Sequence, residues 1–128
     1  MRFIALLDAC VLYPAPLRDF LLRLATTGLF AARWTERIHD EWSRNLLEKR
    51  PELAAQLDRT RRLMNDAVAD SMVGGYDALV DSLNLPDSDD RHVLAAAIHC
   101  HAQAIITFNL KDFPPIGARA LWHRGTSP

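Results

Sequence analysis

Residues 85–114, LPDSDDRHVLAAAIHCHAQAIITFNLKDFP, carry the clearest secondary-structure pattern in this chain of 128 residues. A proline is followed at positions 87–90 by three aspartates and a serine, which is typical of a helix N-terminus. The apolar face of this predicted helix consists of Val93, Leu94, Ala97 and Ile98. Residues 104–108 then form a short apolar run that predicts a strand. A helix leading into a buried strand indicates an α/β protein.

The N-terminal third of the chain repeats this alternation. Residues 2–7 form an almost uninterrupted apolar run, as expected for a central parallel strand that is covered on both faces. Two prolines then precede a predicted helix that Gly28 can close. Its apolar positions at helical spacing are Leu17, Phe20, Leu21 and Leu24. Residues 29–34 predict a second short strand.

The middle of the chain is predicted to be helical. Thr35 is a suitable N-cap for a helix over 36–49, whose apolar residues step by four: Ile38, Trp42 and Leu46. Pro51 interrupts it, and a second helix follows with Leu53, Leu57, Met64 and Val68 on one side. Two glycines at 74–75 mark a break, and residues 76–83 predict a short helix or an ordered loop. The order of elements favours a parallel sheet.

Length and composition restrict the class of protein. A chain of 128 residues with 49% hydrophobic residues suits one domain with a substantial core. The net charge of −1 gives no global basic field, although 13 of the 15 basic residues are arginine, which keeps a nucleic-acid substrate open. Two cysteines favour a reducing, cytoplasmic environment. No apolar run reaches ~18 residues, so no membrane span is expected, and the N-terminal run is interpreted as a strand rather than a signal peptide.

Acidic side chains follow the predicted strands where ligands bind in parallel sheets. Asp8 ends the first strand, and Asn109 and Asp112 follow the strand at 104–108. Asp90 lies in the first turn of the helix before that strand, and Glu41 flanks the apolar stripe of the helix at 36–49. Clustered carboxylates repel one another, and a divalent cation such as Mg²⁺ relieves that repulsion. The pattern therefore predicts a metal site.

Each acid also has a structural interpretation. Asp8 could be a turn or cap residue, and the acids at 87–90 could cap their helix and favour its dipole. Glu41 could lie on a solvated helix face, and Asp112 could anchor a turn. The spacing alone leaves these alternatives open.

Four segments together resemble PIN-domain ribonucleases of the group similar to VapC toxins of toxin–antitoxin pairs. The matching stretches are DACVLYPAPLRDFLLRLA, RWTERIHDEWSRNLL, LPDSDDRHVLAAAI and AIITFNLKDFP. The resemblance implies a three-layer α/β/α fold with a central, mostly parallel sheet and a single domain over residues 1–128. Relatives usually continue past NLKDF into another strand, so this domain is expected to be either truncated after about residue 117 or a genuine short variant of the family.

The resemblance also implies roles for individual residues. Asp8, Glu41 and Asp90 would be the catalytic acids that bind Mg²⁺ or Mn²⁺. Many PIN domains carry a fourth acid where this chain has Asn109, so Asn109 would offer a carbonyl oxygen and Asp112 some of the missing charge. One metal is then as consistent with the sequence as two. Thr107 could hydrogen-bond an acid or a metal-bound water.

The implied activity is endonucleolytic hydrolysis of RNA that leaves 5′-phosphate ends. The implied partners are an RNA substrate, an inhibitory antitoxin protein and a second copy in a homodimer. A catalytically weak or inactive PIN fold that binds RNA or a protein is the alternative. Basic residues near the expected site could contact phosphates or lie solvated on helix faces: Arg18, Arg44 and Arg91.

Other functional classes fit the residues less well. His92 and His99 share a helix side, but no second Cys/His pair has zinc-like spacing, and Cys10 is interpreted as a packing residue. A haloacid-dehalogenase phosphatase needs a second Asp where this chain has Cys10. The patterning supplies no late lysine for a phospho-receiver domain, and no Gly-rich phosphate loop indicates an NTPase.

Overall fold

The computed structural model describes residues 3–83 and 88–108, with the backbone alone for residues 88–90. In chain order the elements are β1 Ile4–Leu7, α1 Ala9–Leu12, α2 Ala15–Thr26, β2 Ala31–Arg33, α3 Glu36–Lys49, η1 Pro51–Leu53, α4 Ala54–Ala67, α5 Asp77–Val80, α6 Ser88–His99 and β3 Ala104–Ile106. The predicted Asn109 and Asp112 and the predicted C-terminal truncation lie outside the described residues.

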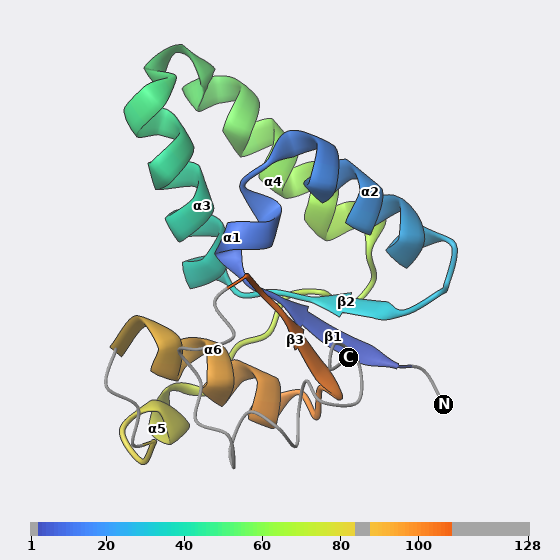
Figure 1. The fold of residues 1–128 in the computed structure, drawn as a ribbon, viewed down its shortest axis with the longest axis vertical. Coiled ribbons are helices and arrows are strands. Elements are labelled where there is room, and N and C mark those ends of the chain that lie inside the picture. Colours follow the sequence, from blue (N-terminus) through green and yellow to red (C-terminus); the bar gives the residue numbers. More distant parts are fainter. Residues whose placement is uncertain (1–2, 84–87, 109–128) are drawn as a thin grey trace.

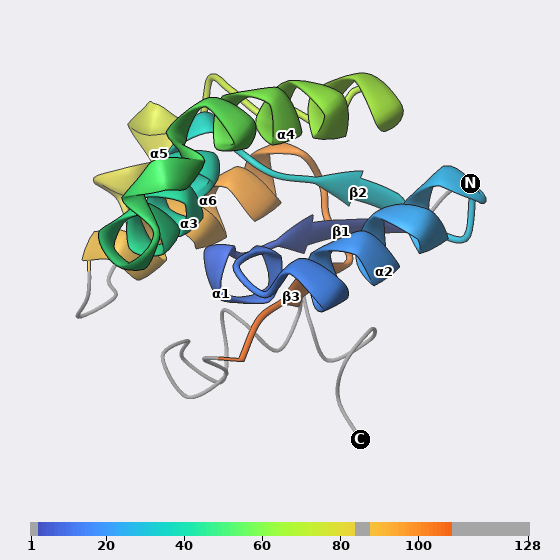
Figure 2. The same ribbon diagram turned by 90° about the horizontal axis from the view of Figure 1, so that it is seen from above.

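The three strands form one parallel sheet in the order β2-β1-β3, which can be followed in Figure 2. Ile4 pairs with Ala31, and Ala5 pairs with Ala104 on the other side. A single bridge between Trp34 and Met72 adds to the β2 edge. The central strand β1 is buried along Ala5–Leu7, as expected for a strand covered on both faces.

Helices cover both faces of this sheet. The helices α1 to α4 lie together on one side, and α5 and α6 lie on the other (Figure 1). The buried core includes large side chains from both sides and from the sheet itself: Trp34, Trp42, Leu6, Leu12, Ile38, Met64, Val93 and Ile105. The predicted α/β fold with a parallel sheet between helices is confirmed.

Local signals in the sequence explain where several helices begin and end. The Thr35 hydroxyl accepts the backbone N–H of Ile38 at 2.9 Å, so α3 begins one residue later, as predicted. Gly28 has φ +85°, a left-handed conformation that suits glycine, and it follows the end of α2. Gly75, with φ +73°, lies in the predicted break before α5.

Two details of the predicted apolar faces are wrong. Phe20 is 56% exposed and Ile98 is 40% exposed, so neither belongs to the core. On α2 the buried positions are instead Arg18, Leu21 and Ala25. The core-facing stripe of α2 is therefore rotated from the predicted one, because the long side chain of Arg18 is buried against Trp42 of α3.

A polar network joins the helices α3 and α4 inside the core. The indole N–H of Trp34 donates to Asn65 Oδ1 at 2.7 Å, and His39 Nε2 lies 2.9 Å from the same oxygen. Trp42 Nε1–H donates to His39 Nδ1 at 3.0 Å. Since Nδ1 accepts, Nε2 carries the proton and donates to Asn65. A neutral His39 therefore has a hydrogen-bond partner at both ring nitrogens.

The stability of the protein is expected to fall as the pH drops below about 6.5 because of His39. Burial is the main cause that lowers the His39 pKa below its ordinary 6.5, and the charge of Arg61 lowers it further. The hydrogen bond with Asn65 and the charges of Glu36 and Asp40 raise this pKa, but they do not outweigh burial. The unfolded chain then binds this proton first, so stability present above pH 6.5 is lost as the pH falls through the folded pKa, by up to about 1.4 kcal/mol per pH unit.

Urea unfolding from pH 8 to 5 measures this slope. His39→Gln, whose amide retains a donor and an acceptor, should show a shallower slope; equal slopes would contradict the assignment.

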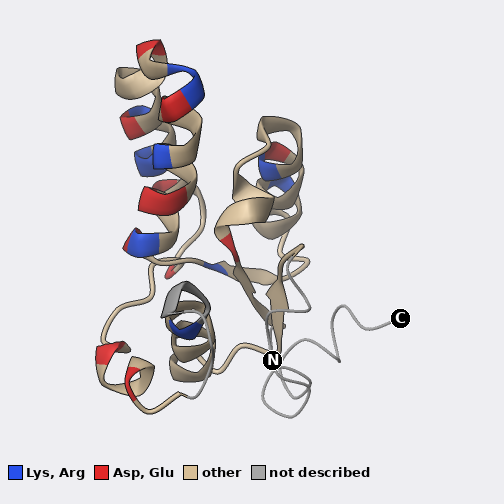
Figure 3. Ribbon diagram, turned by 60° about the vertical axis from the view of Figure 1, so that its left-hand side comes forward, with Lys and Arg blue, Asp and Glu red and all other residues tan. Residues whose placement is uncertain are grey.

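Charges of both signs are interspersed along α3 and α4 (Figure 3). Arg61 of α4 pairs with Glu36 and with Asp40 of α3, the second at 2.9 Å. Within the described part of the chain, no helix is long and apolar enough to cross a membrane.

Candidate metal centre

Asp8 lies at the carboxyl end of the central strand and is only 6% exposed. Its Oδ1 accepts the backbone N–H of Ala9 at 2.7 Å, and its Oδ2 accepts the Thr107 hydroxyl at 2.9 Å. Its own N–H donates to the Ile106 carbonyl at 3.0 Å. Asp8 is therefore the N-cap of α1, one of the two interpretations left open by the sequence. Oδ2 also accepts a long hydrogen bond from the Cys10 thiol at 3.9 Å, whereas Oδ1 keeps a second lone pair for another ligand.

The Asp8 carboxylate is held in an unfavourable environment for its charge. Burial raises its pKa above the ordinary 3.8, and the charge of Glu41 raises it further. The hydrogen bonds from Ala9 and Thr107 and the nearby His92 lower the same pKa, but they do not outweigh burial. A bound cation would reverse this balance, since it favours the ionised form.

Glu41 of α3 reaches the same region from another element. Its side chain is 32% exposed, and its Oε1 lies 3.9 Å from Nε2 of His92 on α6. His92 is fully buried, and neither ring nitrogen has a hydrogen-bond partner among the described residues. Glu41 of α3 therefore lies beside the N-terminal half of α6, and its charge also acts on Asp8 after β1.

Asp90 lies in the first turn of α6, two residues before His92. Its backbone is thus at the end of α6 that faces Glu41, but its side chain is outside the described part of the structure. Among the side chains that are described, no group of three His, Cys, Asp or Glu residues is arranged to hold a metal ion. The predicted set of three acids therefore stays a prediction, with two of its members close together.

Thr107 and Cys10 both contact the Asp8 carboxylate. The predicted hydrogen bond between Thr107 and an acid is confirmed at Asp8. Cys10 Sγ lies 3.4 Å from the Thr107 hydroxyl and accepts the Phe108 N–H at 3.3 Å. Burial raises the pKa of the Cys10 thiol, so a reactive thiolate is disfavoured there. This agrees with the prediction that Cys10 has a packing role.

The three arginines predicted near the site have different environments. Arg18 is 8% exposed and donates to the Leu12 carbonyl at 2.8 Å and the Tyr13 carbonyl at 3.2 Å. Its guanidinium carbon lies 4.7 Å from the centre of the Trp42 ring. The prediction that Arg18 contacts phosphates or lies solvated is therefore wrong. Arg44 is exposed on α3, and Arg91 is partly buried on α6.

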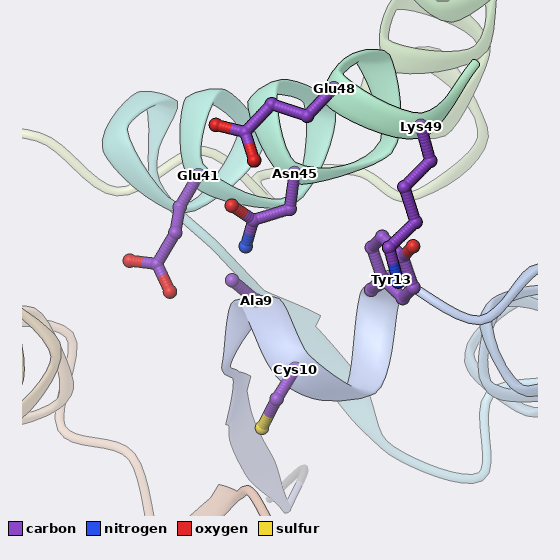
Figure 4. Close-up of a pocket in the computed structure, with 7 residues that line it drawn as sticks. All are labelled: Ala9, Cys10, Tyr13, Glu41, Asn45, Glu48 and Lys49. Atoms are coloured by element: carbon purple, nitrogen blue, oxygen red, sulfur yellow. The ribbon is translucent and has the colours of Figure 1, made fainter.

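A pocket of about 450 Å³ opens beside Glu41, between α1 and α3 (Figure 4). Its walls are formed by Ala9, Cys10, Tyr13, Glu41, Asn45, Glu48 and Lys49. Sequence reasoning identified Glu41 in this set but none of the three polar residues that follow it on α3. The signal that could have found them is a second stripe of polar residues at positions 41, 45, 48 and 49, spaced by three and four residues and so on one face of the helix.

His92 was also missed as a neighbour of Glu41, because the sequence analysis considered it only as a possible zinc ligand and rejected that role. His92 is buried together with the apolar residues that follow it in DDRHVLAAA. A polar residue next to such an apolar segment is the sequence signal that could have indicated a buried polar contact.

Comparison with known families gives one result that covers most of the chain. Residues 5–111 match the family described as the PIN domain. No curated protein and no solved structure matches the chain. PIN domains are typically nucleases, they generally bind divalent metals, and the family implies a nucleic-acid substrate. Because this match covers most of the chain and the observed parallel sheet agrees with it, this chain belongs to the PIN domain family.

Proposed function

We propose that this protein is a metal-dependent endoribonuclease that hydrolyses RNA phosphodiester bonds. The observation that carries the proposal is the pair of carboxylates at the edge of the sheet, Asp8 buried after β1 and Glu41 beside it on α3. A buried carboxylate with a second carboxylate nearby is costly unless a cation joins them. The match to the PIN domain family independently supports nuclease activity.

The donor groups present fit a hard divalent cation. Carboxylate oxygens are the ligands that Mg²⁺ and Mn²⁺ prefer, and Oδ1 of Asp8 keeps a lone pair after its hydrogen bond with Ala9. We assign Asp8, Glu41 and Asp90 as ligands, and Asn109 and Asp112 as further candidates. When bound there, the cation supplies Lewis-acid polarisation of a phosphate and activation of water.

The residues of the chain have separate tasks in this proposal. The Ala9 N–H and the Thr107 hydroxyl fix the orientation of the Asp8 carboxylate, as residues around metal ligands commonly do. The buried His92 faces Glu41 at 3.9 Å and compensates part of the negative charge if it is protonated. Glu41 is the more exposed of the two acids, so it lies on the side from which RNA enters.

The finer biological role is also a proposal. The order of the four matching segments supports a toxin of a toxin–antitoxin pair, held inactive by an antitoxin protein and acting as a homodimer. Co-purification of the protein with the product of a neighbouring gene would test this role separately from catalysis.

Glu41→Gln is expected to reduce RNA cleavage at least about 100-fold, since loss of residues around a metal costs 10- to 100-fold and a direct ligand costs more. The measurement is cleavage of structured RNA in Mg²⁺ or Mn²⁺, with EDTA as the metal-free arm. Glu52→Gln is the matched control, because Glu52 is an exposed glutamate paired only with Arg50 among the described residues. Equal rates for wild type and Glu41→Gln would reject the site. Absence of cleavage of any RNA, together with tight partner binding, would favour a binding module.

Mn²⁺ is expected to raise the melting temperature of the wild-type protein by roughly 10 °C when its concentration is 100 times the dissociation constant. The cation binds the folded cluster of carboxylates and not the unfolded chain. Differential scanning calorimetry with increasing Mn²⁺ measures the shift, and Ca²⁺-free buffer with EDTA gives the baseline. A melting temperature that does not change with Mn²⁺ contradicts the proposed metal site.

A further inference from the structure

The pocket beside Glu41 has a regular arrangement of polar side chains along α3. Glu41, Asn45 and Lys49 are spaced by four residues, so they lie on one face of the helix about 6 Å apart along its axis. Figure 4 shows that all three extend from α3 toward α1, with the Asn45 amide directed at Ala9. The pocket therefore continues from the candidate metal centre for about two helical turns.

The charges of the pocket indicate what kind of group it accepts. Two carboxylates, Glu41 and Glu48, face one ammonium group, Lys49. The Lys49 Nζ lies 5.7 Å from the centre of the Tyr13 ring, so its charge is already partly compensated. A phosphate would meet net negative charge here. A neutral group that both donates and accepts hydrogen bonds fits better.

The volume of the pocket and the chemistry of its walls also favour a neutral, polar organic group. A volume of about 450 Å³ is within the range of roughly 300–1,000 Å³ for pockets that hold small organic groups. The aromatic ring of Tyr13 and the methyl group of Ala9 supply apolar wall, while Asn45 and Glu48 supply acceptors and Asn45 and Lys49 supply donors. A planar heterocycle with polar edges satisfies this combination.

We propose that this pocket is a nucleobase subsite that selects the nucleotide next to the scissile phosphate. The inference rests on the proposed function, because Glu41 is a wall of both the pocket and the metal centre. Glu48 accepts from an exocyclic amino group, and the Asn45 amide pairs with a donor and an acceptor on the base edge. Lys49 donates to a ring nitrogen or a carbonyl oxygen. Adenine, guanine and cytosine carry such an amino group, whereas uracil offers only its N3–H as a donor, so uracil makes fewer hydrogen bonds in the pocket and is disfavoured.

The preference can be measured on the cleavage reaction. A single-stranded RNA library randomised around the cut is digested, and the ends of the products are sequenced for wild type, Glu48→Gln and Asn45→Ala. Wild type is expected to avoid uracil at one position beside the cut, and each variant to reduce that discrimination about tenfold. Glu52→Gln, an exposed glutamate away from the pocket, should behave as wild type. Unchanged discrimination in both pocket variants would overturn the inference.

A binding experiment separates failure of this inference from failure of the proposed function. In EDTA, trinucleotides of adenosine, cytidine or uridine are titrated into wild-type protein, and the NMR signals of the Asn45 side-chain amide and the Tyr13 ring are followed. Adenosine or cytidine trinucleotides are expected to shift these signals and uridine trinucleotides to leave them nearly unchanged. No shift with any of the three trinucleotides, or equal shifts with all three, would overturn the subsite. The Mn²⁺-dependent melting temperature tests the metal centre independently.

Discussion

Asp8→Asn is expected to abolish detectable RNA cleavage and, at the same time, to raise the stability of the metal-free protein at neutral pH. The loss of activity should exceed about 100-fold, because the residue is assigned as a direct metal ligand. The gain in stability follows from burial, which makes the ionised carboxylate unfavourable and raises its pKa above 3.8. Asparagine has a similar shape, carries no charge and can still cap α1 through its carbonyl oxygen.

The pH dependence gives this prediction a definite sign. A carboxyl group with a raised pKa stabilises the folded state fully below its unfolded pKa of about 3.8, and this contribution is lost as the pH rises through the folded pKa. The stability advantage of Asp8→Asn over wild type should therefore be small at pH 4 and grow toward pH 7. Urea unfolding in EDTA at these pH values measures the difference.

Added Mn²⁺ should reverse the order of stability, because only the wild type gains from the cation. Thr60→Ser is a mild change in α4 that serves as the control variant. Its stability should equal that of the wild type both in EDTA and in Mn²⁺. A metal-free Asp8→Asn protein that is less stable than wild type at pH 7 would show that the hydrogen bonds of Asp8 outweigh its desolvation. That outcome would favour the cap interpretation alone.

Arg18→Ala is expected to destabilise the protein by about 3 kcal/mol. The substitution leaves the Leu12 and Tyr13 carbonyls without the guanidinium that they accept from, and it removes the cation that lies over the Trp42 ring. These contacts connect the end of α1 to α2 and α3. Burial lowers the Arg18 pKa, so the charge itself is held at a cost, and the hydrogen bonds and packing are what stabilise the fold.

Arg23→Ala is the matched control, because Arg23 lies on the exposed side of the same helix. Its effect should stay within about 0.5 kcal/mol. Chemical denaturation of the two variants measures the difference, and RNA binding by folded protein measures any role in phosphate contact. An Arg18→Ala protein with wild-type stability and reduced RNA affinity would restore the phosphate-contact hypothesis.

Elements with a strong hydrophobic period could be predicted from the sequence. The helix α3 was predicted over its observed bounds, since Thr35 supplies the cap and Ile38 and Trp42 define the buried stripe. The strand β1 and the start of α6 were predicted for similar local reasons. The order of strands, with β1 in the centre, agrees with its uninterrupted apolar sequence.

Features that depend on contacts between distant segments could not be predicted. The helix α1 has four residues, too few to show a period, and it exists because Asp8 caps it and the chain must turn toward α2. Arg18 is buried only because Trp42 of α3 lies opposite, which no local pattern reveals. The contact between His92 and Glu41 likewise requires the packing of α6 against the sheet.

The sequence predicts the position of Asp8, because ligands bind at the carboxyl ends of central parallel strands. Glu41 lies on α3, whose packing against α1 brings its charge close enough to raise the pKa of Asp8, and no local pattern reveals that packing. The pocket residues Asn45, Glu48 and Lys49 were not singled out, because polar residues on a helix usually indicate only a solvated face. What distinguishes them is the position of α1 opposite, which closes the pocket.

A crystal structure of the wild-type protein soaked in Mn²⁺, with anomalous diffraction recorded to locate the metal, tests the central claim most directly. We expect an anomalous peak about 2.1 Å from carboxylate oxygens of both Asp8 and Glu41, with Asp90 completing the set. Saturating Mn²⁺ that gives no anomalous peak at this edge of the sheet, while Asp8 keeps its hydrogen bonds with Ala9, Thr107 and Cys10, would contradict the assignment of a metal centre.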